Sequence, residues 1–498
     1  MDAFLNSLND IIWSMALVGL CLGLGLYFSV RTRFMQVWGV PEMLRLMFNN
    51  KSSTSGVSSF QALAVSLAGR VGTGNIAGVA TAIAFGGPGA VFWIWAMAFL
   101  GASTSYIECT LAQIYKEKDD QGRYRGGPAY YIEKAMGLKW YAWVFAVVTV
   151  FACGVLLPVV QVNTLASSMQ NAFNLPPLLI AAGIALPLGL IIFGGIKRIA
   201  GFAEMVVPFM AIAYILMALV IMALNYERVP AMFELIMSSA FGLHAGFGAM
   251  LGLAVEWGVK RGIYSNEAGQ GTGPHAAAAA EVQHPAQQGF VQAFAVYVDT
   301  LLVCSATAFM ILATGMYNIP DPTSAGAFLY QALPGAVAGP DFPQAAVDSS
   351  FPGWGAGFVA IALLFFVFTT VMAYYYMAET NIAYINRKVH RPWLILVLRL
   401  TIIGAVFLGV FRTTGGAWAL GDVGVGLMAW LNLVAIVILQ KPALAALRDY
   451  QRQKKAKVAD YDFDPVALGI RNAHYWERRK AGLEPDLPEP GTPAPGDR

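Results

Sequence analysis

The feature that most constrains this chain is a series of apolar runs, each about 20 residues long and nearly free of charge. The run from Ile11 to Val30 contains no charged residue. A helix of about 20 apolar residues crosses a hydrocarbon core roughly 30 Å thick. Of the 498 residues, 57% are hydrophobic and only 12% are charged, whereas soluble domains carry about 25% charged residues. The sequence therefore predicts an all-α protein that spans a membrane many times.

Hydropathy predicts eleven membrane spans along the chain. The seventh span is too long and too rich in glycine for one regular helix, so we expect two pieces or one broken helix. The spans are expected near residues 10–32, 59–84, 89–114, 140–167, 178–195, 200–225, 241–280, 287–316, 355–385, 394–411 and 416–439.

Lysine and arginine residues gather in alternate loops, after the first, third, fifth and ninth spans and in the tail. The long loop at 317–354 has three aspartates and no lysine or arginine. The positive-inside rule then places the N-terminus outside and the C-terminus in the cytoplasm of a bacterial-type inner membrane. The basic stretch at 441–480 either lies on the membrane face or is solvated, and the Pro-rich end beyond about residue 482 is expected to be disordered.

Charge and cysteine content exclude several other classes of protein. The net charge of +3 is too small to predict binding to nucleic acid. The four cysteines all lie in apolar segments without metal-ligand spacing, so we expect free, buried thiols: Cys21, Cys109, Cys153 and Cys304.

The second span contains the segment AGRVGTGNIAGVA, from Ala68 to Ala80. Its glycines and the charged Arg70 disfavour a continuous helix. In lipid, each freed backbone group costs several kcal/mol unless it lines a polar cavity or binds something. Close helix packing explains the glycines, but it does not explain why Arg70, Thr73 and Asn75 cluster at one depth.

The seventh span repeats this feature in YSNEAGQGTGPHAAAAAE, from Tyr264 to Glu281. The breaks are expected near 68–78 and 264–274, and without the first helix each opens a set of five spans. This pattern predicts an inverted repeat with a site near the membrane midplane. The expected units are an extra N-terminal helix and loop at 1–58, a first repeat at 59–225, a second repeat at 226–440 and a basic cytoplasmic tail at 441–498.

Broken helices suit a zwitterion and a cation. A helix that ends inside the membrane exposes carbonyl oxygens, which attract a cation, and one that begins there exposes N–H groups, which attract a carboxylate. The ninth span adds the adjacent hydroxyls of Thr369 and Thr370. Two threonines in an apolar helix can equally well bond to their own helix carbonyls, so both interpretations stay open.

Three long motifs resemble the alanine or glycine:cation symporter family: GTGNIAGVATAIAFGGPGAVFWIW, SNEAGQGTGPHAAAAAE and FTTVMAYYYMAETNIAYI. The resemblance extends from about residue 10 to residue 440. It implies a LeuT-type fold, with the five-plus-five inverted repeat and one additional N-terminal helix. It also implies sodium-coupled uptake of small neutral amino acids such as alanine, glycine and serine, with Na⁺ as the co-transported ion and no organic cofactor.

The resemblance also implies residue roles, because Val71 to Asn75 look like the unwound VGxGN stretch of that fold. The implied sodium ligands are the carbonyls of Ala68, Val71 and Phe366 and the hydroxyls of Thr369 and Thr370. The N–H groups of Thr73 and Gly74 are implied to bind the substrate carboxylate. Further implied substrate contacts are Asn75, Gln161, Tyr264, Thr370 and Tyr374. Asn75 and Asp299 are candidates for a second ion or a coupling site.

Other ionisable residues within spans carry hypotheses of their own, because such residues are usually paired or functional. Glu256 and Lys260 share one helical face and are expected to neutralise each other. Arg70 is expected to pair with Glu267 or Asp299. The carboxylate of Asp299 is a cation ligand, a proton carrier or one half of a structural salt bridge. Two more acidic residues near span ends are expected to matter less: Glu379 and Asp422.

Competing functions are poorly supported. GTGNIAG resembles a dinucleotide fingerprint, but no strand precedes it and no acidic residue follows about 20 positions later. SNEAGQGTGPH lacks the spacing of a zinc protease motif. A channel needs a continuous polar pore, which two broken helices do not predict. We therefore expect a carrier that is not an enzyme, with a proton-coupled or uncoupled carrier, or a channel for another small zwitterion, as alternatives.

Overall fold

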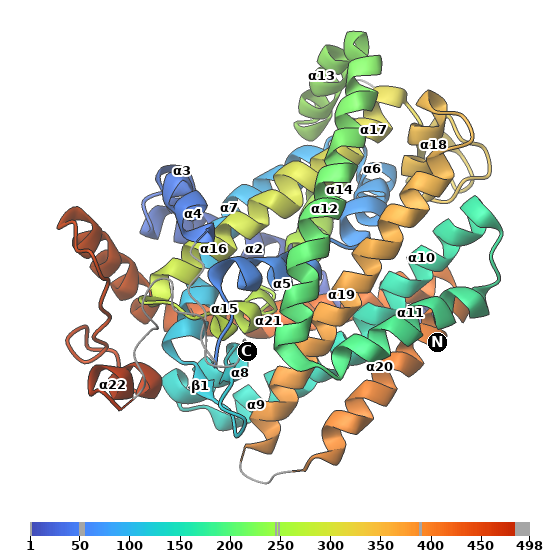
Figure 1. Ribbon diagram of the computed structural model, residues 1–498. Coiled ribbons are helices and arrows are strands. Elements are labelled where there is room, and N and C mark those ends of the chain that lie inside the picture. Colours follow the sequence, from blue (N-terminus) through green and yellow to red (C-terminus); the bar gives the residue numbers. More distant parts are fainter. Residues whose placement is uncertain (1, 49–54, 245–246, 248–249, 388–390, 484–498) are drawn as a thin grey trace.

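The computed structural model describes residues 2–48, 55–244, 247, 250–387 and 391–483. Helices dominate the chain, and they cross one another in a single bundle (Figure 1). The α-helices are α1 Asp2–Ile12, α2 Met15–Arg31, α3 Met35–Trp38, α4 Val40–Met47, α5 Ser59–Arg70, α6 Val79–Gly86, α7 Ala90–Ile114, α8 Pro128–Tyr131, α9 Lys139–Phe151, α10 Leu157–Phe173, α11 Pro177–Ile192, α12 Gly195–Leu224, α13 Val229–Ala240, α14 Leu251–Asn266, α15 Gly273–Ala279, α16 Pro285–Tyr297, α17 Ser305–Thr314, α18 Asp341–Ser350, α19 Gly355–Asn386, α20 Trp393–Phe411, α21 Thr414–Lys455 and α22 His474–Lys480.

Shorter elements interrupt or join these helices. Four are π-helical turns within longer helices: η1 Gly74–Gly78, η2 Ile132–Met136, η3 Ala152–Leu156 and η6 Val298–Cys304. One is a 3₁₀ turn, η4 Tyr226–Arg228. Two antiparallel hairpins pair β1 Glu117–Lys118 with β2 Tyr124–Arg125, and β3 Asn318–Pro320 with β4 Phe328–Gln331.

The prediction of an all-α protein that spans a membrane many times is confirmed. Among the described residues, eight continuous helical segments are long and apolar enough to cross a membrane. The other three predicted spans fall on the two broken segments and on α11, which is 16 residues long. The total of eleven spans stays a prediction, because length and composition alone identify eight.

Both expected breaks are present. The first broken helix, α5, leaves regular geometry at Val71 (ψ 88°), and the helix resumes through η1 into α6. The second ends where Glu267 adopts a left-handed conformation (φ +57°), and α15 begins at Gly273. The expected start of this span at 241 is wrong, since α14 begins at Leu251 and Gly242 (φ +70°) follows the end of α13.

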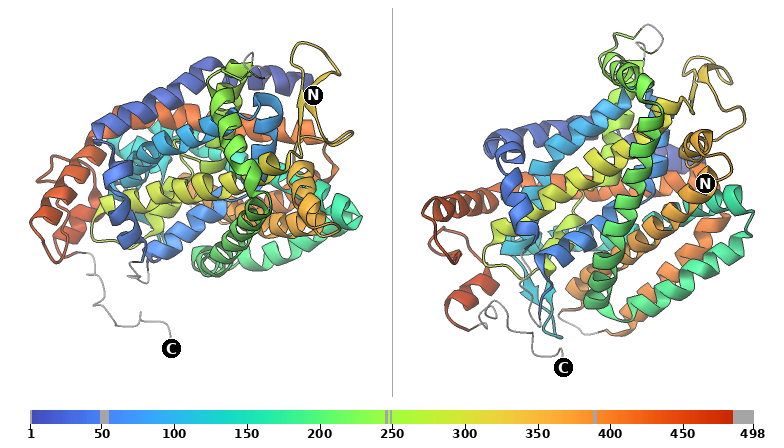
Figure 2. Two further views of the ribbon diagram at one scale, coloured as in Figure 1. Left: turned by 90° about the horizontal axis from the view of Figure 1, so that it is seen from above. Right: turned by 45° about the horizontal axis from the view of Figure 1, so that its top comes forward.

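The packing brings the two breaks together at the centre of the molecule. α7 packs against α14, α15 and α16, while α10 packs against α19, α20 and α21. α5 contacts α12, α15 and α19, so the first break lies between these two groups (Figure 2).

Outside the core, α21 continues to Lys455 and a C-terminal segment folds back beside the β1–β2 hairpin (Figure 1). Trp476 of α22 is buried, and its indole N–H donates to the carbonyl of Gln113 at 2.8 Å. This part of the tail therefore packs on protein and is not fully solvated. From residue 484 onward, the end predicted to be disordered lies outside the described part of the chain.

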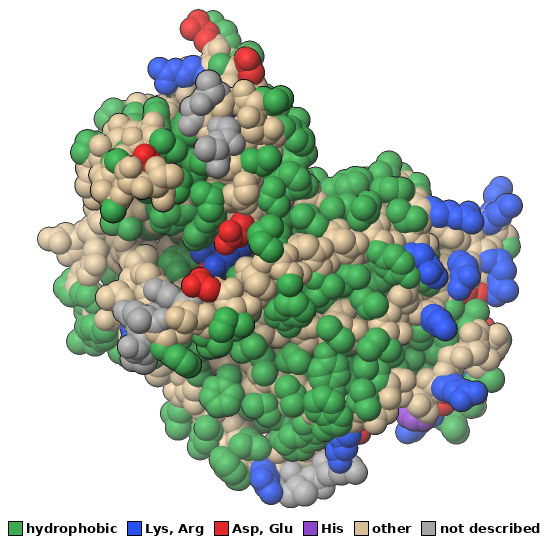
Figure 3. Space-filling view, turned by 180° about the vertical axis from the view of Figure 1, so that it is seen from behind, with side chains coloured by type: hydrophobic (Ala, Val, Ile, Leu, Met, Phe, Trp, Pro, Cys, Tyr) green, Lys and Arg blue, Asp and Glu red, His purple; other side chains and the backbone are tan. Residues whose placement is uncertain are grey.

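The surface agrees with a membrane setting. Figure 3 shows hydrophobic side chains spread over most of one face, with lysine and arginine gathered at one end. All four cysteines are free and buried, as predicted.

Candidate functional site

Polar side chains from three helices converge on Gly72 in the first break. Thr73 donates its backbone N–H to Oε1 of Gln161 on α10 at 3.0 Å, and Gly72 donates to Oδ1 of Asn75 at 2.8 Å. A Cβ atom on Gly72 would lie 2.7 Å from Oγ1 of Thr370 and 2.8 Å from Oε1 of Gln161. Only glycine permits this close approach, so the residue is fixed by the site.

Oxygen atoms gather where a cation was predicted. The hydroxyl of Thr370 on α19 donates to the carbonyl of Phe366 at 2.8 Å and to that of Val71 at 3.2 Å. Two carbonyl oxygens and one hydroxyl from two separate elements therefore meet beside the unwound segment between α5 and η1. The hydroxyl of Thr369 bonds to the carbonyls of Phe365 and Phe366 at 2.9 and 3.0 Å, so both threonines donate to the Phe366 carbonyl of their own helix. Ala68 is buried on α5, one turn before the break.

Asn75 faces away from Gln161, toward Asp299 on η6. Nδ2 of Asn75 donates to the Asp299 carboxylate at 2.6 Å. The hydroxyls of Ser265 and Thr300 donate to the same carboxylate at 2.9 and 2.8 Å. The structure thus brings the two candidate second-ion residues together, joined by donors from both broken regions.

Aromatic rings close the region around Gly74. A Cβ on Gly74 would lie 3.2 Å from the ring of Tyr264, whose centroid is 5.1 Å from that of Trp418. Tyr374 is buried on α19, the helix that carries Thr370. The space near the break is therefore bounded by large rings.

One buried ion-pair cluster lies beyond these rings. Both carboxylate oxygens of Asp422 accept from Arg261, at 2.8 and 3.3 Å. Asp422 also pairs with Lys260 at 2.9 Å, so the expected Glu256–Lys260 pair is wrong. Lys260 follows Glu256 by one helical turn, but it pairs with Asp422 on α21, which only tertiary packing brings to α14. We call Arg261 and Asp422 the first gate pair; Asp422 has two cationic partners on α14.

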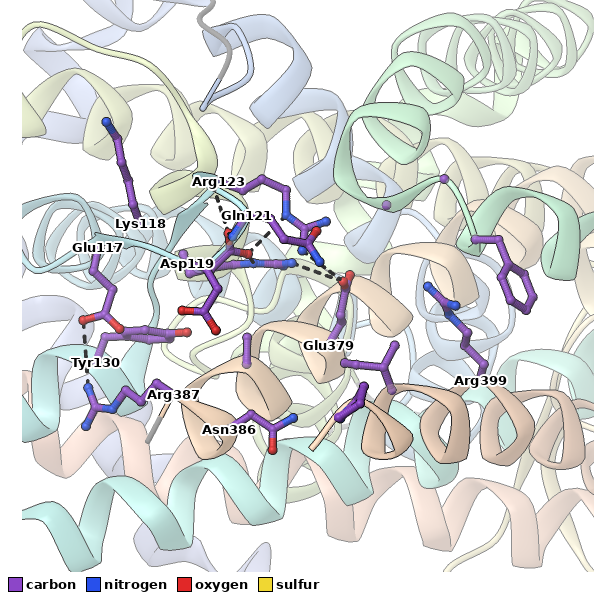
Figure 4. Close-up of a pocket in the computed structure, with 18 residues that line it drawn as sticks. Glu117, Lys118, Asp119, Gln121, Arg123, Tyr130, Glu379, Asn386, Arg387 and Arg399 are labelled. Carbon is purple, nitrogen blue, oxygen red and sulfur yellow. Dashed lines mark hydrogen bonds and ion pairs between the residues drawn. The ribbon is translucent and has the colours of Figure 1, made fainter. Parts of the chain in front are cut away.

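A second charged cluster joins the β1–β2 hairpin to α19, beside a cavity of about 540 Å³ (Figure 4). Arg125 of the β1–β2 hairpin is buried and pairs with Glu379 of α19 at 3.1 Å and with Asp119 at 2.9 Å. Burial opposes ionisation of Asp119, but the guanidinium of Arg125 outweighs it and holds the pKa of Asp119 below its ordinary value. We call Arg125 and Glu379 the second gate pair. Glu379 also matters more than the sequence suggested, because its partner is distant in the chain.

Arg70 does not form the expected ion pair. Among the described residues, no salt bridge joins it to Glu267 or Asp299, and its guanidinium donates to the carbonyl of Gln292 at 3.1 Å and the hydroxyl of Ser105 at 3.3 Å. Neutral acceptors from α16 and α7 reach the guanidinium directly, so the carboxylates act on it only at longer range.

Sequence reasoning missed several of these groups. Arg261 on α14 and Glu108 on α7, whose carboxylate accepts from the backbone N–H of Gly269 at 3.1 Å, both lie inside apolar helices, where a charged residue predicts a function or a partner. That signal was available in the sequence, whereas the partners of Arg125 could be found only from the folded chain.

The arrangement suits a small zwitterion and a cation, and comparisons with known proteins identify relatives. A model of the sodium:alanine symporter family matches residues 1–464. A Bacillus subtilis putative sodium/proton-dependent alanine carrier protein is 60% identical over 96% of this chain and 98% of its own. A sodium/proton-dependent alanine carrier protein of Bacillus sp. PS3 is 50% identical over 87% of this chain and 97% of its own.

A solved structure shares the fold at low sequence identity. The manganese transporter of Eremococcus coleocola, in complex with a bis-isothiourea compound, has a TM-score of 0.50 at 12% identity. The match covers 88% of this chain and 97% of that protein. At this identity the likeness shows the fold alone.

Proposed function

This chain belongs to the sodium:alanine symporter family, and we propose that it imports alanine, glycine and similar small neutral amino acids with Na⁺. It is a transporter and not an enzyme. The observation that carries the proposal is the convergence of Gln161, Asn75 and Thr370 on Gly72 at the break between α5 and η1.

The substrate carboxylate binds the N–H groups of Thr73 and Gly74. Oε1 of Gln161 now accepts from Thr73 at 3.0 Å, which is the bond that a carboxylate oxygen would make. On binding, the Gln161 side chain turns, and its amide NH₂ becomes a donor to the substrate. Carbonyl oxygens at the break take the substrate ammonium group.

The co-transported sodium ion binds the carbonyls of Ala68, Val71 and Phe366 and the hydroxyls of Thr369 and Thr370. A hard monovalent cation prefers oxygen ligands, and the carbonyl oxygens of Phe366 and Val71 lie 2.8 and 3.2 Å from the Thr370 hydroxyl. The Thr369 hydroxyl must turn from its own helix carbonyls to join them.

We expect the site to favour small side chains. A Cβ on Gly72 would overlap Thr370 and Gln161, and the ring of Tyr264, packed on Trp418, lies against Gly74. Tyr374 is buried on α19. A methyl group or a hydroxymethyl group fits such a space better than a long side chain, so alanine, glycine and serine are the expected substrates.

Alternating access follows from the two gate pairs. The first gate pair joins α14 to α21, and the second joins the β1–β2 hairpin to α19. Parting one pair while the other stays closed exposes the site to one side only. From the positive-inside rule we infer that the second gate pair faces the cytoplasm, that the N-terminus lies outside and that the protein lies in the inner membrane.

A proton-coupled carrier is the second candidate, and one observation favours it. Asp299 is fully buried and bonded to Asn75, so a second cation or a proton could reside there. Both relatives described above are named as sodium/proton-dependent.

The proposal is tested by labelled L-alanine uptake into proteoliposomes, with an inward sodium gradient compared against matched potassium and choline. We expect saturable, concentrative uptake that collapses when the sodium gradient is dissipated, with competition by glycine. Equal uptake in all three salts would reject sodium coupling. Absence of uptake by well-folded protein would reject alanine as the substrate.

A further inference from the structure

The two breaks enclose an unbalanced set of buried charges. Arg70 faces three carboxylates, and all four side chains are at most 2% exposed: Arg70, Glu108, Glu267 and Asp299. The Arg70 guanidinium lies against Gly273, next to Thr272, whose hydroxyl donates to Glu267. One positive charge against three negative charges leaves an excess of two negative charges. Buried ions without compensation are very costly, so two cations are needed to neutralise the set.

Two of the carboxylates accept several hydrogen bonds each. Glu108 accepts from the backbone N–H groups of Gly269 and Gly271 at 3.1 and 3.2 Å, and from Nδ2 of Asn432 at 2.7 Å. It therefore occupies the anion-binding turn of the second break. Asp299 accepts from one amide and two hydroxyls, as described above.

Glu267 differs sharply from both. Its Oε2 accepts one hydrogen bond, from the hydroxyl of Thr272 at 2.9 Å, and its Oε1 has no partner among the described residues. A buried carboxylate oxygen without a donor is costly when charged. Of the three carboxylates, Glu267 therefore accepts the fewest hydrogen bonds among the described residues, and its free oxygen can carry a proton.

The surroundings of Glu267 suit a proton better than a metal ion. A Cβ built on Gly69 would lie 3.5 Å from Oε2 of Glu267, 2.9 Å from the methyl of Met377 and 3.6 Å from the Cβ of Ala373. Met377 and Ala373 offer no oxygen, and among the described residues the hydroxyl bonded to this carboxylate is that of Thr272, at 2.9 Å. A metal ion needs more oxygen ligands than one hydroxyl, whereas a proton needs none. The charged and titratable groups that face Glu267 are Arg70 on α5, Asp299 on η6, Tyr264 on α14, Tyr374 on α19 and Cys153 on η3.

We propose that Glu267 is the proton-binding residue of this carrier, and that one proton on Glu267 accompanies one sodium ion beside Thr370. The inference rests on the proposed function. Sodium and the proton together cancel the excess of two negative charges, while the zwitterionic amino acid adds no net charge. The proton is taken from water on one side and released to water on the other, with Glu267 the acid in between.

The position of Glu267 links the proton to the movement. Glu267 ends α14 in a left-handed conformation, and the Arg70 guanidinium lies against Gly273 at the start of α15. A charged Glu267 attracts Arg70 across the two breaks. A neutral Glu267 does not, so protonation weakens the electrostatic tie between the two broken helices.

The experiment uses the full-length protein in proteoliposomes that contain a trapped pH indicator. Wild-type protein is expected to acidify the lumen when alanine and sodium are added outside. Glu267→Gln resembles the protonated form. We expect it to keep sodium-dependent alanine binding and exchange but to lose alanine-driven acidification, down to the level of protein-free liposomes. Glu256→Gln, on the same helix, is the matched control and should acidify like the wild type.

The outcomes separate this inference from the proposed function. Sodium-driven alanine uptake without proton movement in the wild type, or acidification by Glu267→Gln, would overturn the inference and leave sodium symport standing. Absence of sodium dependence in the wild type would overturn the proposed function instead. If Glu267→Gln does not fold, Glu267→Asp decides: a shifted pH midpoint of alanine affinity supports the inference, and an unchanged midpoint overturns it.

Discussion

Thr370→Val is the most direct test of the sodium site. Valine has nearly the same shape as threonine, so the substitution removes the hydroxyl without opening a cavity. The lost oxygen lies 2.8 Å from the Phe366 carbonyl and 3.2 Å from the Val71 carbonyl. Because these carbonyls belong to α19 and to the broken helix, the hydroxyl connects the two sides of the site.

The expected size of the effect follows from the chemistry of one ligand. Hydrogen-bond-like contacts to a charged group contribute about 1.5–3 kcal/mol. At 1.4 kcal/mol per factor of ten, sodium affinity should fall by roughly ten- to a hundredfold. Thr369→Val should have the smaller effect, because its hydroxyl bonds to its own helix in this structure. The double variant should weaken sodium activation most.

The assay is the sodium dependence of alanine uptake in proteoliposomes, fitted for half-activation at saturating alanine. Thr149→Val is the matched control, since this buried hydroxyl bonds only to the Phe145 carbonyl of its own helix, at 2.9 Å. Half-activation by sodium should not change in the control. Unchanged half-activation in both Thr370→Val and the double variant would refute the assigned sodium ligands.

Three further predictions follow from the packing. In Gly72→Ala the new Cβ must displace side-chain atoms of Thr370 and Gln161 that lie 2.7 and 2.8 Å away. Overpacking of about 1–3 kcal/mol should weaken alanine binding roughly five- to a hundredfold. Wild-type alanine affinity in a calorimetric titration would contradict the geometry. Asp422→Asn leaves Arg261 buried without its carboxylate, so α14 should exchange backbone hydrogens faster than in the wild type; equal exchange would show that the pair does not hold the closed form. Burial lowers the pKa of Lys116 to about 7, although Glu281 opposes this. When α22 leaves Lys116, we expect its pKa to return to the ordinary value near 10.5. The docked form therefore favours neutral Lys116, and docking of α22 should strengthen as pH rises from about 7 to 10.5. Hydrogen exchange at Trp476, corrected for intrinsic rates, measures this docking, and Lys116→Met should abolish its pH dependence.

The sequence was sufficient for the membrane architecture and for both breaks, because apolar length and glycine content act locally. Hydropathy located α7 and α19 closely, and the glycines of 68–80 and 264–274 marked where the helices unwind. The short elements were missed for the same reason. α13 and α18 carry no signal that distinguishes them from loop sequence, and both hairpins have strands of only two to four residues.

The ionic partners could not be read from the sequence, because each joins residues far apart in the chain. Arg261 and Asp422 are separated by 161 positions, and Arg125 and Glu379 by 254. The local spacing of Glu256 and Lys260 predicted a pair, but Asp422 on a neighbouring helix is the partner that Lys260 meets. Spacing along one helix shows which residues share a face, and only packing decides which charge reaches them.

The hydrogen bonds at the first break also bear on coupling. With no ligand, Gln161 accepts from Thr73 and Asn75 accepts from Gly72, so neither buried N–H group lacks a partner. Substrate without sodium displaces Gln161 and leaves the oxygens around Thr370 without a cation. We therefore expect the carrier to close at a higher cost with substrate alone than with substrate and sodium, which is one condition for coupled transport.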